Sequence, residues 1–382
     1  MSLQRIGTLV RLELTQRVRS VAWYVLLGVF FVLLLIVTAL AFAVFPPVPD
    51  DSTGTFGPPS GPGAYSVVVY FVLLLSVLVS PTLSGNAING DRDAATLAPV
   101  QVTLATTAEI LLGKFLAAWI TGLAFIAVAL PFLIVAMVAG SVPAATLLVS
   151  FVILIVEIGV IAGVGVGLSG ILARPLFSVA VTYLVVAALV VGTLIAFGLG
   201  GSAIRSETVN SYRTLVYDEQ QSFPQVPPEC MTAEPGQTEP LPQCIIGPTE
   251  PTYTCGPWQT TRYEVARFDR VWWFLAANPL VVLADATPST FRDGYPVDLF
   301  SQIKSGVRFV QQPPQLETTW DECDQDAGQR ESPTAEEVVE STTPSWFVGL
   351  AIQLALTAAL LLWAWARTRT PARRLPPGTR IA

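Results

Sequence analysis

The sequence predicts an all-α polytopic membrane protein with six transmembrane helices, and three observations lead to this class. The chain of 382 residues is 52% hydrophobic and only 13% charged, whereas a soluble domain is typically about 25% charged. Several apolar runs reach the roughly 20 residues that a helix needs to cross a bilayer core. The charge is also segregated, because 21 of the 28 acidic residues lie in the segment 201–344.

The start of the chain predicts a helix that lies flat in the membrane interface. Residues 1–20 place apolar side chains at helical spacing with arginines between them, a pattern typical of an interfacial amphipathic helix. A basic start before an apolar run is also typical of a signal peptide. The run 21–45 is too long for a signal sequence and lacks a small-x-small cleavage site, so we expect an uncleaved first span.

Five of the six spans are expected within residues 21–200, and the sixth follows the long polar segment 201–344. The expected spans are 21–45, 65–83, 110–139, 144–172, 176–200 and 345–366. Pro131 is expected to kink the third of them. The tail 367–382 has five arginines and no acidic residue.

The distribution of basic residues predicts the orientation of these spans, because short loops rich in Lys and Arg stay cytoplasmic. With the N-terminus inside, the cytoplasmic segments are the first helix, the 84–114 segment, the turn at Arg174 and the tail. They hold 12 of the 21 Lys and Arg residues but only 4 acids. Both termini are therefore expected in the cytoplasm and residues 201–344 outside it.

All four cysteines of the chain lie in the 201–344 segment. Two disulfides in an oxidising compartment are expected, and four free thiols are the alternative. A zinc site is less favoured, because the CxxC pairs typical of structural zinc are missing. The sequence leaves the pairing open among Cys230, Cys244, Cys255 and Cys323.

Residues 271–287 are apolar but are interrupted at Asn278 and contain Asp285. A full span there would move the arginine-rich tail outside and separate Cys323 from the other cysteines. We therefore expect a re-entrant or interfacial hairpin, with a buried core helix of the external domain as the alternative. Its predicted interfacial anchors are Trp272 and Trp273.

Several classes of function are excluded or disfavoured. The chain has no histidine, which excludes a Ser-His-Asp triad and a His-ligated metal. It also has no G-x-x-x-x-G-K-[ST] motif for nucleotide phosphates, and no nucleophile–base pair is evident. We therefore expect a non-catalytic membrane subunit that holds no metal or cofactor and binds no nucleic acid. The glycines of the fourth span are expected to serve close helix packing.

Glu157 is the exception among the apolar side chains of the fourth span. A charge at that depth costs a few kcal/mol or more unless it is paired, protonated or hydrated. Two interpretations stay open: a carboxyl in a transport pathway, or a carboxyl hydrogen-bonded to a neighbouring helix.

The polar segment 84–114 separates the second and third spans. It contains Asp91-Arg92-Asp93-Ala94-Ala95-Thr96-Leu97 and then Thr106-x-x-Glu109-Ile110-Leu111-Leu112-Gly113-Lys114. Thr106 and Glu109 have the spacing of a capping box, which predicts a helix start there. A plain solvated turn is the simpler interpretation of the rest.

This segment resembles the second-to-third-span signature of ABC-2 type permeases. The resemblance implies six spans per subunit, an N-terminal interfacial helix, re-entrant helices before the last span, and a cytoplasmic coupling helix that docks on an ATPase. The implied coupling residues are Asp91, Arg92, Asp93, Thr96 and Leu97. The sequence departs from the family pattern at Pro99, which limits the coupling helix to about 89–98, and at Leu104, where a proline is common. The external segment is also larger than usual.

The resulting hypothesis is the permease subunit of an ATP-driven exporter in a bacterial cell membrane. Its implied partners are cytosolic ATPase subunits that hold ATP and Mg²⁺, a second identical or homologous permease subunit, the lipid bilayer, and an optional extracytoplasmic partner. One alternative is a membrane-anchored sensor or scaffold that presents the external segment. Another is a proton-coupled carrier that uses Glu157, which is less favoured because the spans show no internal repeat.

Overall fold

The computed structural model describes residues 2–45, 60–93, 106–217, 253–324 and 333–368. The chain divides into two compact units. The helical unit comprises Met1–Gly201, Phe268–Gln312 and Thr334–Ala382, and the strand unit comprises Ser202–Arg267 and Pro313–Pro333. The segment 201–344, expected as a single domain, is thus shared between the two units.

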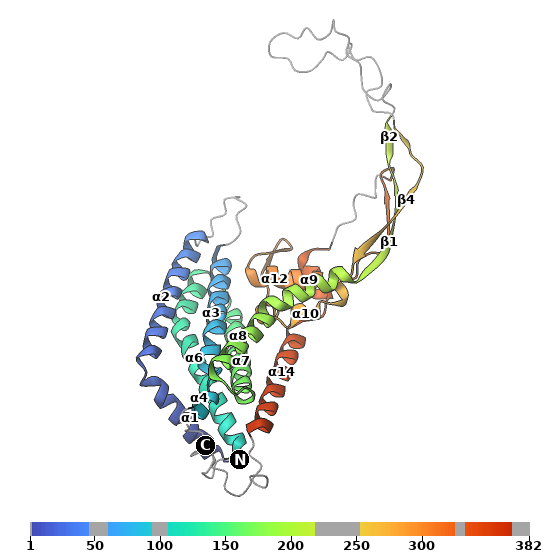
Figure 1. Cartoon of the computed structure of the whole chain (residues 1–382). Coiled ribbons are helices and arrows are strands. Elements are labelled where there is room, and N and C mark those ends of the chain that lie inside the picture. Colours follow the sequence, from blue (N-terminus) through green and yellow to red (C-terminus); the bar gives the residue numbers. More distant parts are fainter. Residues whose placement is uncertain (1, 46–59, 94–105, 218–252, 325–332, 369–382) are drawn as a thin grey trace. The chain divides into compact units, whose positions relative to one another are not determined.

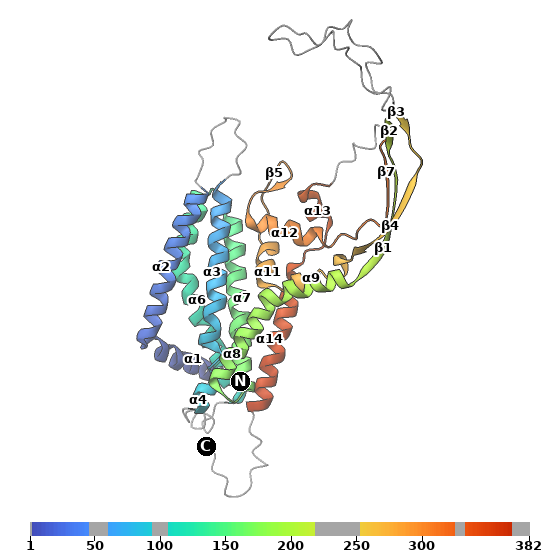
Figure 2. The same cartoon turned by 45° about the horizontal axis from the view of Figure 1, so that its top comes forward.

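Within the described residues, six helices are long and apolar enough to cross a membrane, as the sequence predicts. They are α2 (Val21–Val44), the run from α3 (Ser60–Ser84) to α4 (Asn89–Asp93), α6 (Thr107–Ala139), α7 (Ala144–Ile171), the run from α8 (Pro175–Ala187) to α9 (Thr193–Ala203), and α14 (Trp346–Thr368). The helix α1 (Leu3–Val18) precedes them and lies across the ends of its neighbours (Figure 2). These features fit a multi-pass membrane protein.

The helix α7 lies at the centre of the helical unit, beside α3, α6 and α14 (Figures 1 and 2). Its glycines allow close approach, as expected. A Cβ atom added to Gly170 would lie 2.6 Å from the Cβ of Ala364, and one added to Gly167 would lie 2.8 Å from the Cβ of Leu360. Both α14 residues are larger than glycine, so only glycine on the α7 side permits this spacing.

The fifth apolar helix contains a π-helical turn, η1 (Ala188–Gly192), between α8 and α9. Such turns leave carbonyl groups without their usual intrahelical partner. Here the Asn278 amide donates to the Val190 carbonyl at 2.8 Å and to the Thr193 hydroxyl at 3.0 Å. A side chain from a distant segment thus satisfies the distorted turn.

Asn278 also divides the 271–287 segment into α10 (Trp273–Ala276) and α11 (Pro279–Ala286), where it accepts the Leu280 N–H as N-cap. The predicted interruption is therefore present. Both short helices belong to the helical unit, and α11 packs against α7 and α14. The buried-helix alternative holds in part, because α11 is largely buried, although its surroundings are the apolar helices rather than a separate external domain. Trp273 is 44% exposed and Trp272 is half-buried.

A buried ion pair joins α11 to α12, and its carboxylate also binds the start of α14. Asp285 accepts from Arg308 Nε at 2.7 Å, and both side chains are at most 4% exposed. The same carboxylate accepts the Trp346 N–H and the Ser345 hydroxyl, each at 2.9 Å. Arg308 lies on α12 (Leu299–Phe309) and also donates to the Thr342 carbonyl beyond α13 (Ala335–Ser341). An anion at the start of α14 is favourable for the helix dipole.

Replacing Asp285 with asparagine is expected to destabilise the helical unit by about 3–5 kcal/mol, because it leaves the Arg308 guanidinium buried without its counter-ion. Thermal unfolding of the purified full chain measures this as a lower Tm. The matched control is Asp293→Asn, at an exposed aspartate in a positive-φ turn that asparagine tolerates. Equal Tm values for Asp285→Asn and the control would contradict the structural role of the pair.

The strand unit corrects the all-α class. Its three-stranded sheet has the order β4-β1-β7, in which β1 (Arg205–Arg213) pairs antiparallel with β4 (Gln259–Ala266) and parallel with β7 (Glu317–Asp321). Two short strands, β2 (Leu215–Tyr217) and β3 (Tyr253–Cys255), also pair, and the helical unit holds the hairpin β5 (Phe291–Arg292) and β6 (Tyr295–Pro296). Threonine and tyrosine favour strands, but the long apolar runs dominated the assignment of class.

Cys255 and Cys323 form a disulfide across the strand unit, with their Cα atoms 6.0 Å apart. Cys230 and Cys244, the other two candidates, lie outside the described residues. The Cys323 N–H donates to Asp321 Oδ1 at 3.0 Å, and the Arg213 Nε donates to the same oxygen at 2.9 Å. The Arg213 guanidinium also stacks over the Trp258 ring, 4.9 Å from its centroid.

The hydrogen bonds from Arg213 hold the pKa of Asp321 below its ordinary value of 3.8. The stabilisation is therefore fully present above that value and is lost as the pH falls through the lower pKa of the folded state. We expect hydrogen exchange of the β1 and β7 amides, corrected for intrinsic rates, to accelerate below about pH 4. Asp321→Asn should remove this acid response; an unchanged response in that variant would exclude Asp321 as its source.

Candidate functional site

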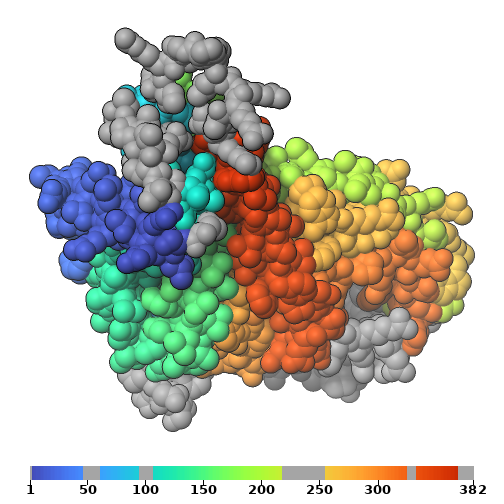
Figure 3. Space-filling view, turned by 90° about the horizontal axis from the view of Figure 1, so that it is seen from below, coloured from blue at the N-terminus to red at the C-terminus, as the bar shows by residue number. Residues whose placement is uncertain are grey.

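The candidate site is a cluster of charged side chains where α1, α4 (Asn89–Asp93) and the first turns of α6 meet. Figure 3 views this end of the helical unit, with α1 in dark blue and α14 in red. We call this end of the helical unit the α1 end. The residues that form it come from three separate parts of the chain.

The start of α6 has the predicted capping box. The Thr106 hydroxyl accepts the Glu109 N–H at 3.3 Å, and the Glu109 carboxylate accepts the Thr106 N–H at 2.8 Å. The same carboxylate, 1% exposed, accepts the Ser2 N–H at 2.6 Å and lies 3.9 Å from an Arg5 nitrogen. Glu109 therefore begins one helix and attaches the start of α1 to it.

Lys114 is the central residue of the cluster. Its side chain is only 6% exposed, and its ammonium lies 2.6 Å from a Glu13 oxygen on α1 and 2.5 Å from an Asp91 oxygen on α4. The sequence predicted Lys114 only as part of the start of the third span. Burying an ammonium group is costly unless anions pair with it. Lys114 therefore requires both α1 and α4 to pack against α6.

Two further contacts connect the cluster to other helices. Arg17 donates to the Leu83 carbonyl at 2.9 Å and so satisfies a group in the last turn of α3. Burial lowers the pKa of this guanidinium, and the charge of Glu13 acts in the opposite direction. The Ser169 hydroxyl of α7 accepts the Ile88 and Asn89 N–H groups at 2.9 and 3.1 Å. The short helix α4 is thus attached to α6 and to α7.

The charged residues of α4 point in different directions. Asp91 turns toward Lys114, whereas Arg92 and Asp93 are exposed. Thr96 and Leu97, the other two predicted coupling residues, lie outside the described residues, and so do Pro99 and Leu104. Within the described part of the predicted 89–98 helix, Arg92 and Asp93 are therefore the exposed charges.

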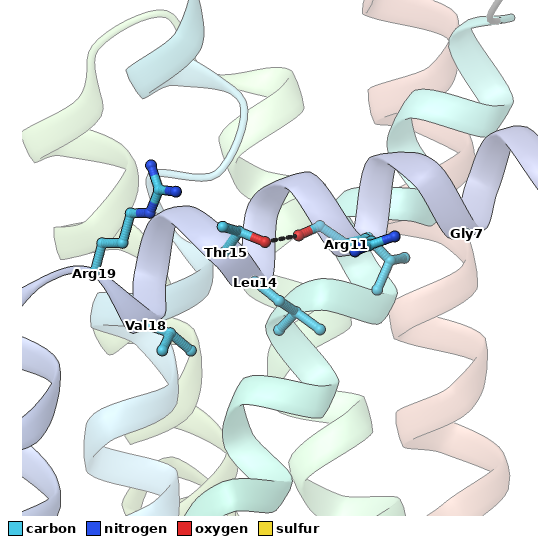
Figure 4. A pocket seen from close by; sticks show the side chains of 7 residues that line it. Gly7, Arg11, Leu14, Thr15, Val18 and Arg19 are labelled. Atoms are coloured by element: carbon cyan, nitrogen blue, oxygen red, sulfur yellow. Dashed lines mark hydrogen bonds between the residues drawn. The ribbon is translucent and has the colours of Figure 1, made fainter.

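A groove along α1 combines apolar and cationic side chains. It has a volume of about 460 Å³ and is lined by Gly7, Val10, Arg11, Leu14, Thr15, Val18 and Arg19. Figure 4 shows Leu14 and Val18 on one side of the helix and Arg19 on the other. A groove lined by both apolar and cationic side chains suits a helix at an interface with anionic lipid.

Not every predicted residue joins this cluster. Glu157 lies within α7, is 0% exposed, and has no hydrogen-bond partner for either carboxylate oxygen among the described residues. Trp272, Trp273 and the disulfide lie in other parts of the structure. Conversely, sequence reasoning assigned no role to Glu13 or Ser169. Glu13 is the only acid in the first 20 residues, and this isolation among arginines indicates a specific role. Nothing in the sequence distinguishes Ser169 from the other small residues of its helix.

A comparison with known protein families finds none whose sequence model matches this chain, and a search of curated proteins finds no significant match. The resemblance of residues 91–114 to ABC-2 type permeases thus concerns a short motif and stays a prediction.

Replacing Lys114 with methionine is expected to loosen α1 and α4 together, because both Glu13 and Asp91 lose their counter-ion. Since these acids are partly exposed, the cost should be about 1–3 kcal/mol. Hydrogen exchange of the α1 and α4 amides should accelerate roughly 5- to 100-fold. Arg11→Met, at an exposed arginine of α1, is the control. Loss of protection confined to α6 would contradict the bridging role.

Proposed function

We propose that this protein is the permease subunit of an ABC-2 type exporter in a bacterial cell membrane and that α4 is its coupling helix. The observation that carries the proposal is the attachment of α4. The Asp91 carboxylate of α4 binds Lys114 of α6. Two N–H groups at the start of α4 donate to the Ser169 hydroxyl of α7. A partner that moves α4 would therefore move α6 and α7 with it.

The proposal also assigns separate roles to the charges of α4. Asp91 forms an ion pair with Lys114 inside the protein, whereas the exposed Arg92 and Asp93 are available to an ATPase subunit. Opposite charges next to each other suit a partner groove of complementary charge, which fixes the register of docking. The sequence has no phosphate-binding glycine-rich motif, so ATP and Mg²⁺ would be held by that separate subunit.

In this proposal the α1 end and both termini are cytoplasmic, and the strand unit is extracytoplasmic. Two features support this orientation. The segments assigned to the cytoplasm hold 12 of the 21 Lys and Arg residues of the sequence, and the Cys255–Cys323 disulfide suits an oxidising compartment. A second permease subunit would complete the transport path between the two copies.

Co-purification of the tagged full chain from membranes of its own host tests the proposal. We expect the wild-type chain to retain a protein that contains a P-loop motif and hydrolyses ATP with Mg²⁺. Reversal of both exposed charges, Arg92→Glu with Asp93→Lys, should reduce the retained ATPase about tenfold or more, equivalent to about 1.4 kcal/mol of binding.

The matched control is Arg174→Glu, at an exposed arginine in the turn between α7 and α8, which should retain the ATPase at the wild-type level. Absence of a P-loop ATPase from the wild-type preparation would contradict the transporter function and favour the sensor or scaffold. Equal retention by the reversal variant would contradict docking through α4.

A further inference from the structure

Glu157 and Gln353 form a buried polar pair that the packing of apolar helices does not explain. Glu157 lies on α7 and Gln353 on α14, and both are 0% exposed. The helices α7 and α14 run side by side in the same direction, because Gly163 lies beside Thr357 and Gly170 beside Ala364. The Thr357 hydroxyl donates to the Val160 carbonyl at 3.4 Å, so Gln353, one turn before Thr357, lies beside the turn of α7 that contains Glu157. Among the described residues, no hydrogen bond satisfies either Glu157 oxygen or Gln353 Oε1. Three acceptor oxygens are therefore buried in one place without a donor.

We propose that Glu157 carries a proton at neutral pH and that the acid and the Gln353 amide form a neutral pair between α7 and α14. The acid O–H would donate to Gln353 Oε1, and one N–H of the amide would donate to the second Glu157 oxygen. The other amide N–H already donates to the Ala277 carbonyl at 3.1 Å. One proton thereby satisfies all three unpartnered oxygens.

The surroundings of the pair favour a proton over a counter-ion. The described helices packed on α7 are α3, α6, α8, α11 and α14. These helices carry few charged side chains. Glu109, Lys114 and Asp285 form ion pairs with other residues. Arg367 lies in the last turn of α14. An unpaired carboxylate at this depth is strongly disfavoured, and protonation removes its charge.

Neighbouring contacts place Lys114 away from the acid. Along α7, Gly159 lies beside Trp119 and Gly163 lies beside Phe115. Lys114, next to Phe115 in the sequence, is therefore more than one helical turn farther along α7 than Glu157. Its ammonium is already occupied by Glu13 and Asp91, so it does not neutralise Glu157.

A metal ion does not suit the same site. Ca²⁺ takes about six to eight oxygen ligands, whereas the pair offers three oxygens. Within the described part of the chain, no group of three or more His, Cys, Asp or Glu side chains is placed to hold a metal. The site therefore suits a proton rather than a metal ion.

Infrared spectroscopy of the full chain in lipid vesicles at pH 7 tests the proposal, because protonated and ionised carboxyl groups absorb in different regions. We expect the difference spectrum of wild type minus Glu157→Gln to contain one carboxylic acid C=O band and no carboxylate bands. The exchanged variant, Glu157→Gln with Gln353→Glu, should recover the acid band, because it rebuilds the pair with the partners reversed.

The control is Glu340→Gln, at an exposed glutamate of α13, which should lose carboxylate intensity and keep the acid band. If Glu157→Gln does not fold, Gln353→Leu replaces it: the acid band should persist and shift to the frequency of an acid without a hydrogen bond. Carboxylate bands from Glu157 at pH 7, paired or hydrated, would overturn the proposal. The readout involves no ATPase, so it is independent of the proposed transport function.

Discussion

The pairing of the Lys114 ammonium is the interaction on which the α1 end of this protein depends. A lysine whose side chain is 6% exposed needs counter-ions close to its ammonium group. The two counter-ions of Lys114 come from α1 and α4. A single charge on α6 therefore determines where two other helices lie. Glu109, five residues earlier on α6, reinforces the arrangement because its carboxylate both binds the start of α1 and caps α6.

A second buried charge cluster, formed by Asp285 and Arg308, lies at the start of α14. Asp285 receives hydrogen bonds from Arg308 and from the first residues of α14, so the last apolar helix begins at a defined point. Between these clusters the helices meet through glycines on α7, which supply close contact but little directional information. The polar groups of the two clusters therefore determine how these otherwise apolar helices align with one another.

This arrangement gives α4 a role that its five residues would not suggest. A helix of this length is not stable by itself, and its position is held by Ser169 and Lys114 from two longer helices. These bonds are short and partly buried, so they attach α4 to both α6 and α7. That property is what a coupling element of the proposed permease requires, and it uses Asp91 for attachment while Arg92 and Asp93 stay accessible.

The sequence by itself determined the features that depend on local chemistry. Apolar length predicted all six long helices, the Thr106–Glu109 spacing predicted the start of α6, and Asn278-Pro279 predicted the break between α10 and α11. Only the tertiary structure decided which residues meet: Lys114 with Glu13 and Asp91, Glu157 with Gln353, Cys255 with Cys323, and the strands of the second unit. The reason is physical. In a membrane protein apolar side chains face both lipid and neighbouring helices, so the hydrophobic pattern that reveals the inward face of a soluble helix is missing. The pairing of polar groups far apart in the chain then depends on how the helices are rotated and packed.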